Sequence, residues 1–157
     1  MLELAHKLAD SDAKFFGGWV LAGVEAHIHG EAVKLENNVL LAKELRVFLV
    51  LPKRTLGTKP ADAIAAGECV ARHVFTAQEI ADYVAYTGDE NIIHKGEHPI
   101  VPGLCMAAWL ERELQLTELD WKLSFLSPVY AGDELRVYDD GEKLAAYVGA
   151  ANVFVIK

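Results

Sequence analysis

One stretch of the chain is apolar on every side of the helix that it would form, and this constrains the fold most. Residues 104–110 read LCMAAWL and directly follow the pair Pro102 and Gly103. A helix whose whole surface is apolar belongs in a protein core. We interpret the Pro-Gly pair as the start of this helix, and the charged triplet at residues 111–113 as the place where it reaches solvent. The rest of the chain must therefore cover a buried helix.

Strand-like segments stand on both sides of that helix in the sequence. After it they occupy residues 121–130, 134–138 and 144–156, and they are broken at Gly132, at 139–141 and around Gly149. Before it they occupy residues 20–28, 39–41 and 45–50, with a turn predicted at 36–38. A buried helix wrapped by antiparallel strands is the simplest α+β architecture for this order.

A second helix is predicted shortly before the buried one. Thr76 and Glu79 have the spacing of a capping box, in which a hydroxyl and a carboxylate satisfy the first amides of a helix. The apolar residues that follow at helical spacing are Ala77, Ile80, Ala81 and Val84. Gly88 is suited to the left-handed residue that ends a helix. Asp89 is therefore expected on a loop just past the helix end.

Composition limits the classes of partner and compartment. A length of 157 residues fits one domain, and a formal net charge of -8 argues against nucleic acid or an anionic membrane surface as the main partner. Cys69 and Cys105 show no metal or disulfide spacing, so we expect reduced thiols in a cytoplasmic protein. The start of the chain does not resemble a signal peptide, and we find neither a membrane-spanning run nor an internal repeat.

Two pairs of residues suggest chemistry. Asp89 and His94 lie five residues apart, and together they supply a general base and a proton partner close to the helix start at Gly103. His27 and His29 share one face of a strand, as paired zinc ligands do, but neither a cysteine nor an acidic cluster accompanies them. We therefore predict an acid–base site and no metal.

Three motifs around these residues resemble one known family. The first motif consists of Tyr86, Gly88, Asp89, Asn91, Ile92, Ile93 and His94. The second is the PIVPG segment at residues 99–103, and the third spans residues 123–135 and includes a Pro-Val pair and a Gly-Asp pair. In this order they resemble the MaoC-like, or R-specific enoyl-CoA hydratase, branch of the hotdog fold. The resemblance covers residues 70–157.

The chain departs from that family at several positions. Ile92 stands where the family usually has proline, Gly96 stands where it usually has an acid, and the loop from His94 to Pro99 is short. The chain also ends soon after Asp133, which leaves few strands for a full sheet. We therefore expect residues 1–60 to complete the sheet of a single hotdog domain that spans residues 1–157, with residues 70–157 as the MaoC-like part.

Residues 94–103 also resemble a second hotdog branch, the bacterial 3-hydroxyacyl-ACP dehydratases. That branch carries a catalytic glutamate on the helix at the position that Ala108 occupies here, although Glu111 lies one turn further on. Both resemblances imply the same reaction type, which is reversible loss of water from a 3-hydroxyacyl thioester.

The resemblance implies roles for four residues. Asp89 and His94 would activate water for hydration of enoyl thioesters of CoA or acyl carrier protein, or for dehydration of their (3R)-hydroxyacyl forms. Gly103 and Asn91 would be the oxyanion and substrate-binding residues, with the Gly103 amide facing the oxyanion and Asn91 stabilising the loop. The resemblance implies no metal or organic cofactor. It also implies a homo-oligomer, because hotdog proteins usually pair so that two sheets become continuous.

Two other functions remain open at the level of sequence. Hotdog proteins also hydrolyse acyl thioesters, a reaction for which Asp89 or Glu111 would have to attack the carbonyl or activate water there. The short loop after His94 and the missing proline also suit a non-catalytic hotdog protein that binds acyl groups or supports a partner.

Overall fold

A computed structural model describes residues 20–26, 34–36, 39–42, 45–50, 65–116 and 121–157, the first four segments through their backbone alone. The predicted turn at 36–38 falls mostly outside these residues, and so do His27 and His29.

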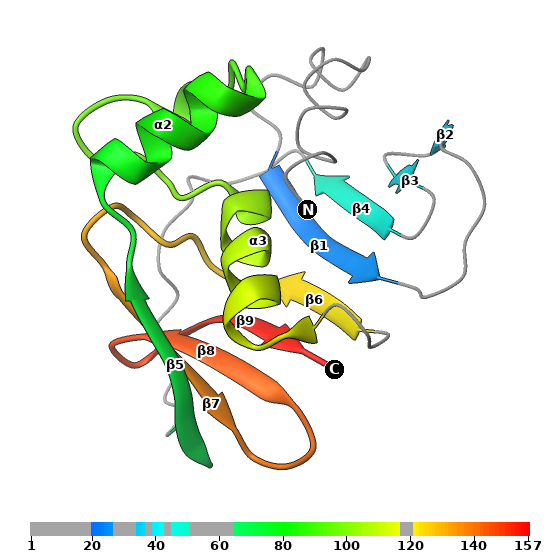
Figure 1. The fold of residues 1–157 in the computed structure, drawn as a ribbon, viewed down its shortest axis with the longest axis vertical. Coiled ribbons are helices and arrows are strands. Elements are labelled where there is room, and N and C mark those ends of the chain that lie inside the picture. Colours follow the sequence, from blue (N-terminus) through cyan, green and yellow to red (C-terminus); the bar gives the residue numbers. More distant parts are fainter. Residues whose placement is uncertain (1–19, 27–33, 37–38, 43–44, 51–64, 117–120) are drawn as a thin grey trace.

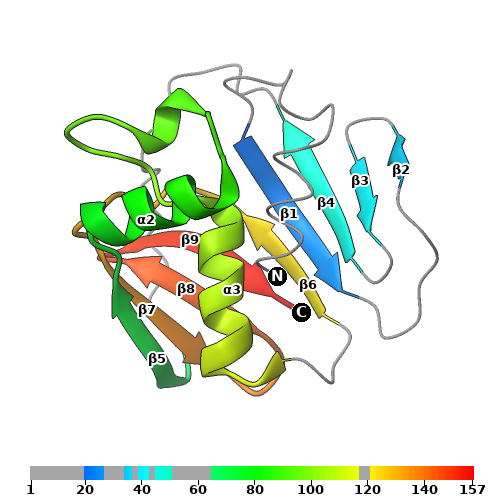
Figure 2. The same cartoon turned by 45° about the horizontal axis from the view of Figure 1, so that its top comes forward.

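In the described part of the chain, nine antiparallel strands form one sheet in the order β2-β3-β4-β1-β6-β9-β8-β7-β5 (Figure 1). The strands are β1 (Val20–Ala26), β2 (Lys34–Glu36), β3 (Val39–Ala42), β4 (Leu45–Val50), β5 (Glu68–Val74), β6 (Trp121–Phe125), β7 (Glu134–Asp139), β8 (Leu144–Val148) and β9 (Ala151–Ile156). The helices are α2 (Ala77–Thr87), the 3-10 helix η2 (Ile92–His94) and α3 (Gly103–Glu113). Figure 2 shows α3 lying along one face of the sheet, with α2 near the end at which α3 begins.

Helix α3 forms the centre of the core, as its sequence predicts. Its buried side chains are Leu104, Met106, Ala107, Trp109 and Leu110. The side chains of β6 to β9 in the same core cluster include Leu123, Leu135, Val137, Ala146 and Phe154, and none of these five is exposed to solvent. Burying a leucine or phenylalanine side chain completely contributes about 1.5–3 kcal/mol. The expected wrapping of antiparallel strands around a central apolar helix is confirmed.

Strands from the first third of the chain belong to the same sheet. β1 pairs with β6, with Gly23 opposite Ser124 and Ala26 opposite Trp121. On its other side β1 pairs with β4, and β3 and β2 follow outward. Strands β1 to β4 therefore extend the sheet beyond β6, while β5 forms the opposite edge among the described strands.

Strand β6 is shorter than the sequence suggested. It ends at Phe125, whereas the strand-like run continues to residue 130. The amides of Leu126 and Ser127 both point to the carbonyl of Val153, at 2.9 and 3.3 Å, so the regular ladder stops there. Pro128 follows and has no amide to donate, which suits the end of a strand.

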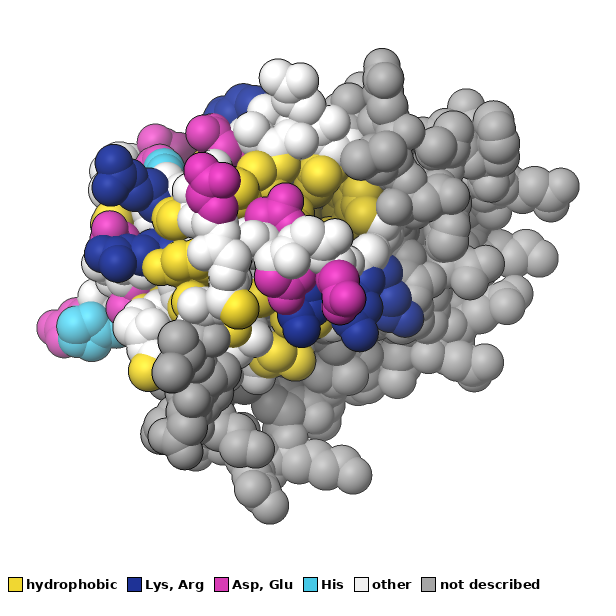
Figure 3. All heavy atoms as spheres, turned by 90° about the horizontal axis from the view of Figure 1, so that it is seen from below, with side chains coloured by type: hydrophobic (Ala, Val, Ile, Leu, Met, Phe, Trp, Pro, Cys, Tyr) yellow, Lys and Arg dark blue, Asp and Glu magenta, His cyan; other side chains and the backbone are white. Residues whose placement is uncertain are grey.

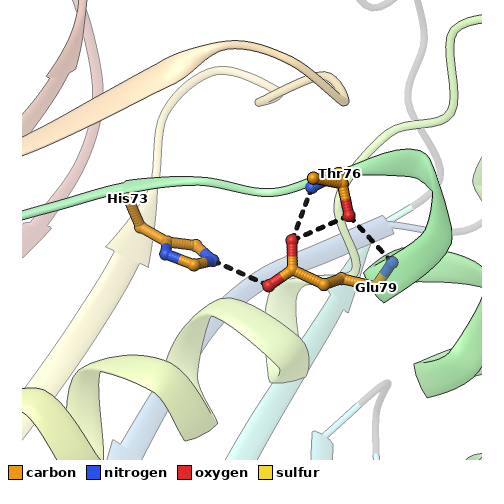
Figure 4. A network of polar contacts seen from close by, with 3 residues as sticks. All are labelled: His73, Thr76 and Glu79. Atoms are coloured by element: carbon orange, nitrogen blue, oxygen red, sulfur yellow. Dashed lines mark hydrogen bonds and ion pairs between the residues drawn. The ribbon is translucent and has the colours of Figure 1, made fainter.

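The predicted capping box of α2 is confirmed. The Thr76 hydroxyl accepts a hydrogen bond from the Glu79 amide at 3.1 Å, and the Glu79 carboxylate accepts one from the Thr76 amide at 2.7 Å. His73 at the end of β5 adds a contact to the same carboxylate at 3.2 Å (Figure 4). The start of α2 is thus tied to the sheet edge.

The surface carries charges of both signs. Figure 3 shows one face on which hydrophobic side chains gather at the centre, with basic and acidic side chains around them. Two valines of the edge strand β5 are also partly exposed, Val70 at 41% and Val74 at 43%. In the described part of the chain, every helix is too short or too polar to cross a bilayer.

Candidate active site

The end of α2 positions the first candidate residue. Gly88 adopts the left-handed conformation, with φ 73° and ψ 20°, and its amide donates to the Val84 carbonyl at 2.9 Å. A residue without a side chain beyond hydrogen adopts this conformation at little cost, so glycine ends the helix here, as predicted. The chain then turns, and Asp89 is the first residue on the loop.

Asp89 uses one carboxylate oxygen to hold its own loop. Its Oδ1 accepts a hydrogen bond from the Asn91 amide at 2.9 Å. Such a bond between an aspartate and the amide two residues on is typical of a tight turn and fixes the direction of the carboxylate. The second oxygen, Oδ2, is therefore directed by this turn toward the chain that follows.

Asn91 starts the short helix η2, which delivers the second candidate residue. Its side-chain oxygen lies 3.4 Å from the Ile93 amide, and its carbonyl accepts from the His94 amide at 3.2 Å. The structure thus gives Asn91 the loop-stabilising contacts that its residue type predicts. Ile92, which replaces the usual proline, is 76% exposed and makes no part of the core.

His94 is held from behind by a backbone carbonyl. Its Nδ1 lies 2.8 Å from the carbonyl oxygen of Ile100, which can only accept, so Nδ1 carries the proton. The Ile100 amide in turn donates to the Ile93 carbonyl at 2.9 Å. The imidazole side chain is only 8% exposed. These contacts fix both the position of the ring and its tautomer.

The free nitrogen of His94 faces the free oxygen of Asp89. His94 Nε2 and Asp89 Oδ2 are 3.6 Å apart. Burial lowers the pKa of His94, and the Asp89 charge and the hydrogen bond to Ile100 only partly oppose this effect. A neutral ring protonated at Nδ1 presents a lone pair at Nε2. Two acceptors therefore face each other, and a small molecule with two donors, such as water, can bridge them.

The start of α3 offers amide donors close to this pair in the sequence. Pro102 occupies the N-cap position and supplies no side-chain cap, and its carbonyl accepts from the amides of Cys105 and Met106. The Gly103 amide thus lies at the positive end of the helix. Ile100, which binds His94, precedes Gly103 by three residues, so the same segment positions the imidazole and the helix start.

Two features of the site escaped the sequence analysis. One is the Ile100 carbonyl, a backbone group that no residue type reveals. The other is Tyr83, whose pKa is raised by burial first and then by the nearby Cys105 and Asp89. Its phenol therefore stays protonated. The only available signal was its position on the apolar face of α2, one turn before Thr87.

Other candidate groups are not arranged for chemistry. Burial raises the pKa of the Cys105 thiol to about 12, which keeps it protonated and unsuited to act as a nucleophile. Among the residues whose placement is described, no three histidine, cysteine or acidic side chains come together as a metal site would need. The His27 and His29 pair lies outside those residues.

Comparison with solved structures agrees with the motif resemblance. HtdX of Mycobacterium tuberculosis matches with a TM-score of 0.62 at 14% identity, over 98% of this chain and 84% of that chain. The peroxisomal multifunctional enzyme type 2 of Drosophila melanogaster matches with a TM-score of 0.57 at 14% identity, over 99% of this chain and 39% of that chain.

A MaoC-like dehydratase from Phytophthora capsici also matches, with a TM-score of 0.51 at 11% identity, over 88% of this chain and 68% of that chain. Neither a protein-family model nor a curated protein sequence matches the chain. Similarity at these identities concerns the fold. The chain thus has the hotdog fold, and it is similar in structure to a MaoC-like dehydratase.

Proposed function

We propose that this protein adds water reversibly to enoyl thioesters and forms (3R)-hydroxyacyl thioesters of CoA or acyl carrier protein. One observation carries the proposal: the lone pair of His94 Nε2 and the Oδ2 atom of Asp89 face each other across 3.6 Å. Water is the reactant that donates to both. The hotdog fold and the MaoC-like motifs support the choice of a thioester substrate.

The dyad gives the reaction a simple proton balance. The water oxygen forms a bond to C3 of the enoyl group, and one water proton passes to the dyad. The π electrons of the C2–C3 double bond move toward the thioester carbonyl, and the dyad then returns a proton to C2. The net change is addition of OH to C3 and H to C2, without any redox partner. Positioned acid–base groups of this kind contribute about 10²–10⁴-fold to a rate.

The negative charge that develops on the thioester oxygen needs a donor. We assign this role to the Gly103 amide, at the positive end of α3 and without a side-chain cap at Pro102. A preorganised oxyanion donor contributes about 2.7–4 kcal/mol in other enzymes. No step in this scheme calls for a metal or an organic cofactor.

The test is to follow the absorbance of the conjugated enoyl group when the purified protein meets crotonyl-CoA, with free thiol measured in parallel. Loss of the enoyl signal without thiol release, and formation of the (3R) product on a chiral column, are the expected results. Release of thiol would instead assign the protein to the thioester hydrolases.

Longer and carrier-bound enoyl thioesters form the second arm of the test. Absence of any product across acyl chains of increasing length, on CoA and on acyl carrier protein, would contradict the proposal. The protein would then be a hotdog-fold protein that binds acyl groups without converting them.

A further inference from the structure

Tyr83 is an almost fully buried tyrosine whose hydroxyl is not used by the fold. It lies on the buried face of α2 together with Ile80 and Thr87, and only 9% of its surface is exposed. A buried tyrosine usually gives its hydroxyl a hydrogen-bond partner, because an unpaired polar group in a core costs free energy. The Tyr83 hydroxyl makes no hydrogen bond to any residue that the structure describes. Its presence therefore needs another explanation.

The hydroxyl is nevertheless not sealed off from solvent. In the described part of the chain, Asn152 Oδ1 is the only fully buried side-chain nitrogen or oxygen atom that lacks a hydrogen-bond partner. The Tyr83 oxygen also lacks a partner, so it remains accessible to solvent even though the ring that carries it is buried. A ring held in the core thus presents its hydroxyl as a donor to water or to a ligand.

The surroundings of Tyr83 place this hydroxyl beside the candidate active site. Its side chain belongs to the same core cluster as Leu104 in the first turn of α3, and Cys105 packs against that cluster. Figure 2 shows α2 near the end at which α3 begins. Cys105 and Asp89 are the two charged or titratable groups that act on the phenol. Because Cys105 follows Gly103 by two residues, the phenol lies close both to the start of α3 and to Asp89.

The Tyr83 phenol keeps its proton near neutral pH and can therefore act as a donor. Burial raises the pKa of Tyr83 first, and the nearby Cys105 and Asp89 raise it further. A protonated phenol suits an oxygen atom that gains negative charge during a reaction. In the hydration scheme that atom is the thioester oxygen, whereas the attacking water must keep a lone pair free for its bond to C3. The thioester oxygen is therefore the better acceptor for Tyr83.

We propose that Tyr83 donates a hydrogen bond to the thioester carbonyl oxygen of the substrate and shares this oxygen with the Gly103 amide. A carbonyl oxygen has two lone pairs and can accept from both donors. The two donors come from α2 and from the start of α3, so the relative position of these helices determines where the oxygen lies. The inference rests on the proposed function, because it requires a thioester at this site. It adds to the site a side chain to which no motif gave a role.

A second buried tyrosine provides a matched control. Tyr147 of β8 is 8% exposed, and its ring meets that of Tyr138 edge-on with the centroids 5.9 Å apart. The preceding residue, Ala146, belongs to the core cluster. Since successive side chains of a strand point to opposite faces, Tyr147 lies on the other face of the sheet. Tyrosine-to-phenylalanine substitution removes the same atom at both positions, but only Tyr83 is close to Asp89.

The first test compares Tyr83→Phe with Tyr147→Phe in the hydration of crotonyl-CoA. We expect Tyr83→Phe to lower kcat by about 10²–10³-fold, as removal of one oxyanion donor does in other enzymes. KM should change by less than about threefold, because the oxygen gains its charge in the transition state. Tyr147→Phe should match wild type. Tyr83→Phe should melt no lower than wild type, since the fold loses no hydrogen bond. An unchanged kcat or a lower melting temperature in Tyr83→Phe would overturn the inference.

The second test measures the hydrogen bond itself and does not depend on turnover. Butyryl-CoA labelled with ¹³C at the thioester carbonyl has no double bond to hydrate, and its carbonyl band in infrared difference spectra moves to lower frequency when donors bind the oxygen. We expect this shift in wild type and Tyr147→Phe, and a partial loss of it in Tyr83→Phe. Equal bands in all three proteins, or no band from bound butyryl-CoA, would overturn the inference. A shift that depends on Tyr83 in a protein that hydrates no enoyl thioester would support the inference and contradict only the proposed reaction.

Discussion

Helix α2 has a histidine–carboxylate pair at each end, and only one of the two is arranged for chemistry. At its start, His73 Nε2 lies 3.2 Å from Glu79 Oε1. At its end, His94 Nε2 lies 3.6 Å from Asp89 Oδ2. The two pairs use similar residue types at similar distances. Their surroundings give them different roles.

At the start of α2, the carboxylate is already fully used. The other oxygen of Glu79 accepts from the Thr76 amide at 2.7 Å and from the Thr76 hydroxyl at 2.9 Å (Figure 4). His73 stacks on Trp109 of α3, with ring centroids 5.5 Å apart, and meets Phe75 edge-on. This pair joins the edge strand, α2 and α3, and we interpret it as structural.

At the end of α2, the same kinds of atoms are anchored differently. Asp89 holds its loop with one oxygen and His94 holds the Ile100 carbonyl with one nitrogen. The remaining atoms, Asp89 Oδ2 and His94 Nε2, can each act as a hydrogen-bond acceptor. Because burial lowers the pKa of His94, the imidazole is neutral and carries no proton on Nε2. The comparison shows that a histidine–carboxylate pair becomes a candidate catalyst when its other atoms are anchored and the facing atoms are not.

The largest effect should come from removing the carboxylate charge of Asp89 in the pair that it forms with His94. We expect Asp89→Asn to lower kcat for enoyl hydration by about 10²–10⁴-fold, because the amide presents a donor as well as an acceptor to the water. The matched change in the pair of His73 and Glu79, Glu79→Gln, should leave kcat within about threefold of wild type. Similar losses in both variants, each folded by circular dichroism, would end the distinction between the pairs.

The next effect is on the pH dependence of the reaction. Only neutral His94 offers a lone pair at Nε2, and burial lowers its pKa. Therefore kcat/KM should start to decrease only when the pH drops below the ordinary histidine value of 6.5. The slope should approach tenfold per pH unit. The same lowered pKa means that stability decreases as the pH falls from 6.5 toward the folded pKa, because the unfolded chain takes up the proton first. An acid limb at or above pH 6.5 would contradict this assignment.

A smaller effect is expected at the glycine that positions Asp89. Gly88 has φ 73° and its Cβ position is open, so Gly88→Ala would meet no atom but would strain the backbone. The cost should be about 1–2 kcal/mol in the free energy of unfolding, measured by urea denaturation. Gly88→Asn tolerates this conformation better and is the matched control. If both variants were as stable as wild type, the left-handed helix end would be wrong.

The smallest effect is expected at the capping box. Thr76→Ala should lower the free energy of unfolding by about 1 kcal/mol, or the melting temperature by about 2–4 °C, with kcat unchanged. Thr76→Ser keeps the hydroxyl and should stay close to wild type. The hydrogen bond from the Thr76 amide lowers the pKa of Glu79. The stabilisation that the ionised Glu79 carboxylate gives the fold should therefore be present above pH 4.5 and should be lost as the pH falls through the folded pKa. A lower kcat in Thr76→Ala would instead show that the His73–Glu79 pair influences the Asp89–His94 pair.

Local patterns predicted the helices well and the sheet less well. Thr76 and Glu79 predicted the start of α2, and Gly88 predicted its end, because capping depends on residues that are neighbours in the sequence. β5 was not predicted, since a bulge at Val70 interrupts its alternation and its inner face includes the small Ala71 and the polar His73. The β1–β6 pairing joins residues about a hundred positions apart, and short patterns contain no information on such contacts.

The candidate site shows the same division. Asp89, His94, Asn91 and Gly103 were singled out from motifs, and the structure brings Asp89 and His94 face to face. Their roles remain predictions. The Ile100 carbonyl could not be predicted, because it reaches His94 only when the loop between them closes. That carbonyl determines which nitrogen of the imidazole is free.

The protonation of His94 is therefore the most direct test of this account. Long-range ¹H–¹⁵N spectra of the ¹⁵N-histidine protein at pH 7, assigned with His94→Ala, distinguish the two tautomers and the cation. We predict a neutral ring with its proton on Nδ1 and a bare Nε2 toward Asp89. A proton on Nε2, in either the other tautomer or the imidazolium, would leave Asp89 Oδ2 as the one acceptor of the pair and would contradict the proposed bridging of both groups by water.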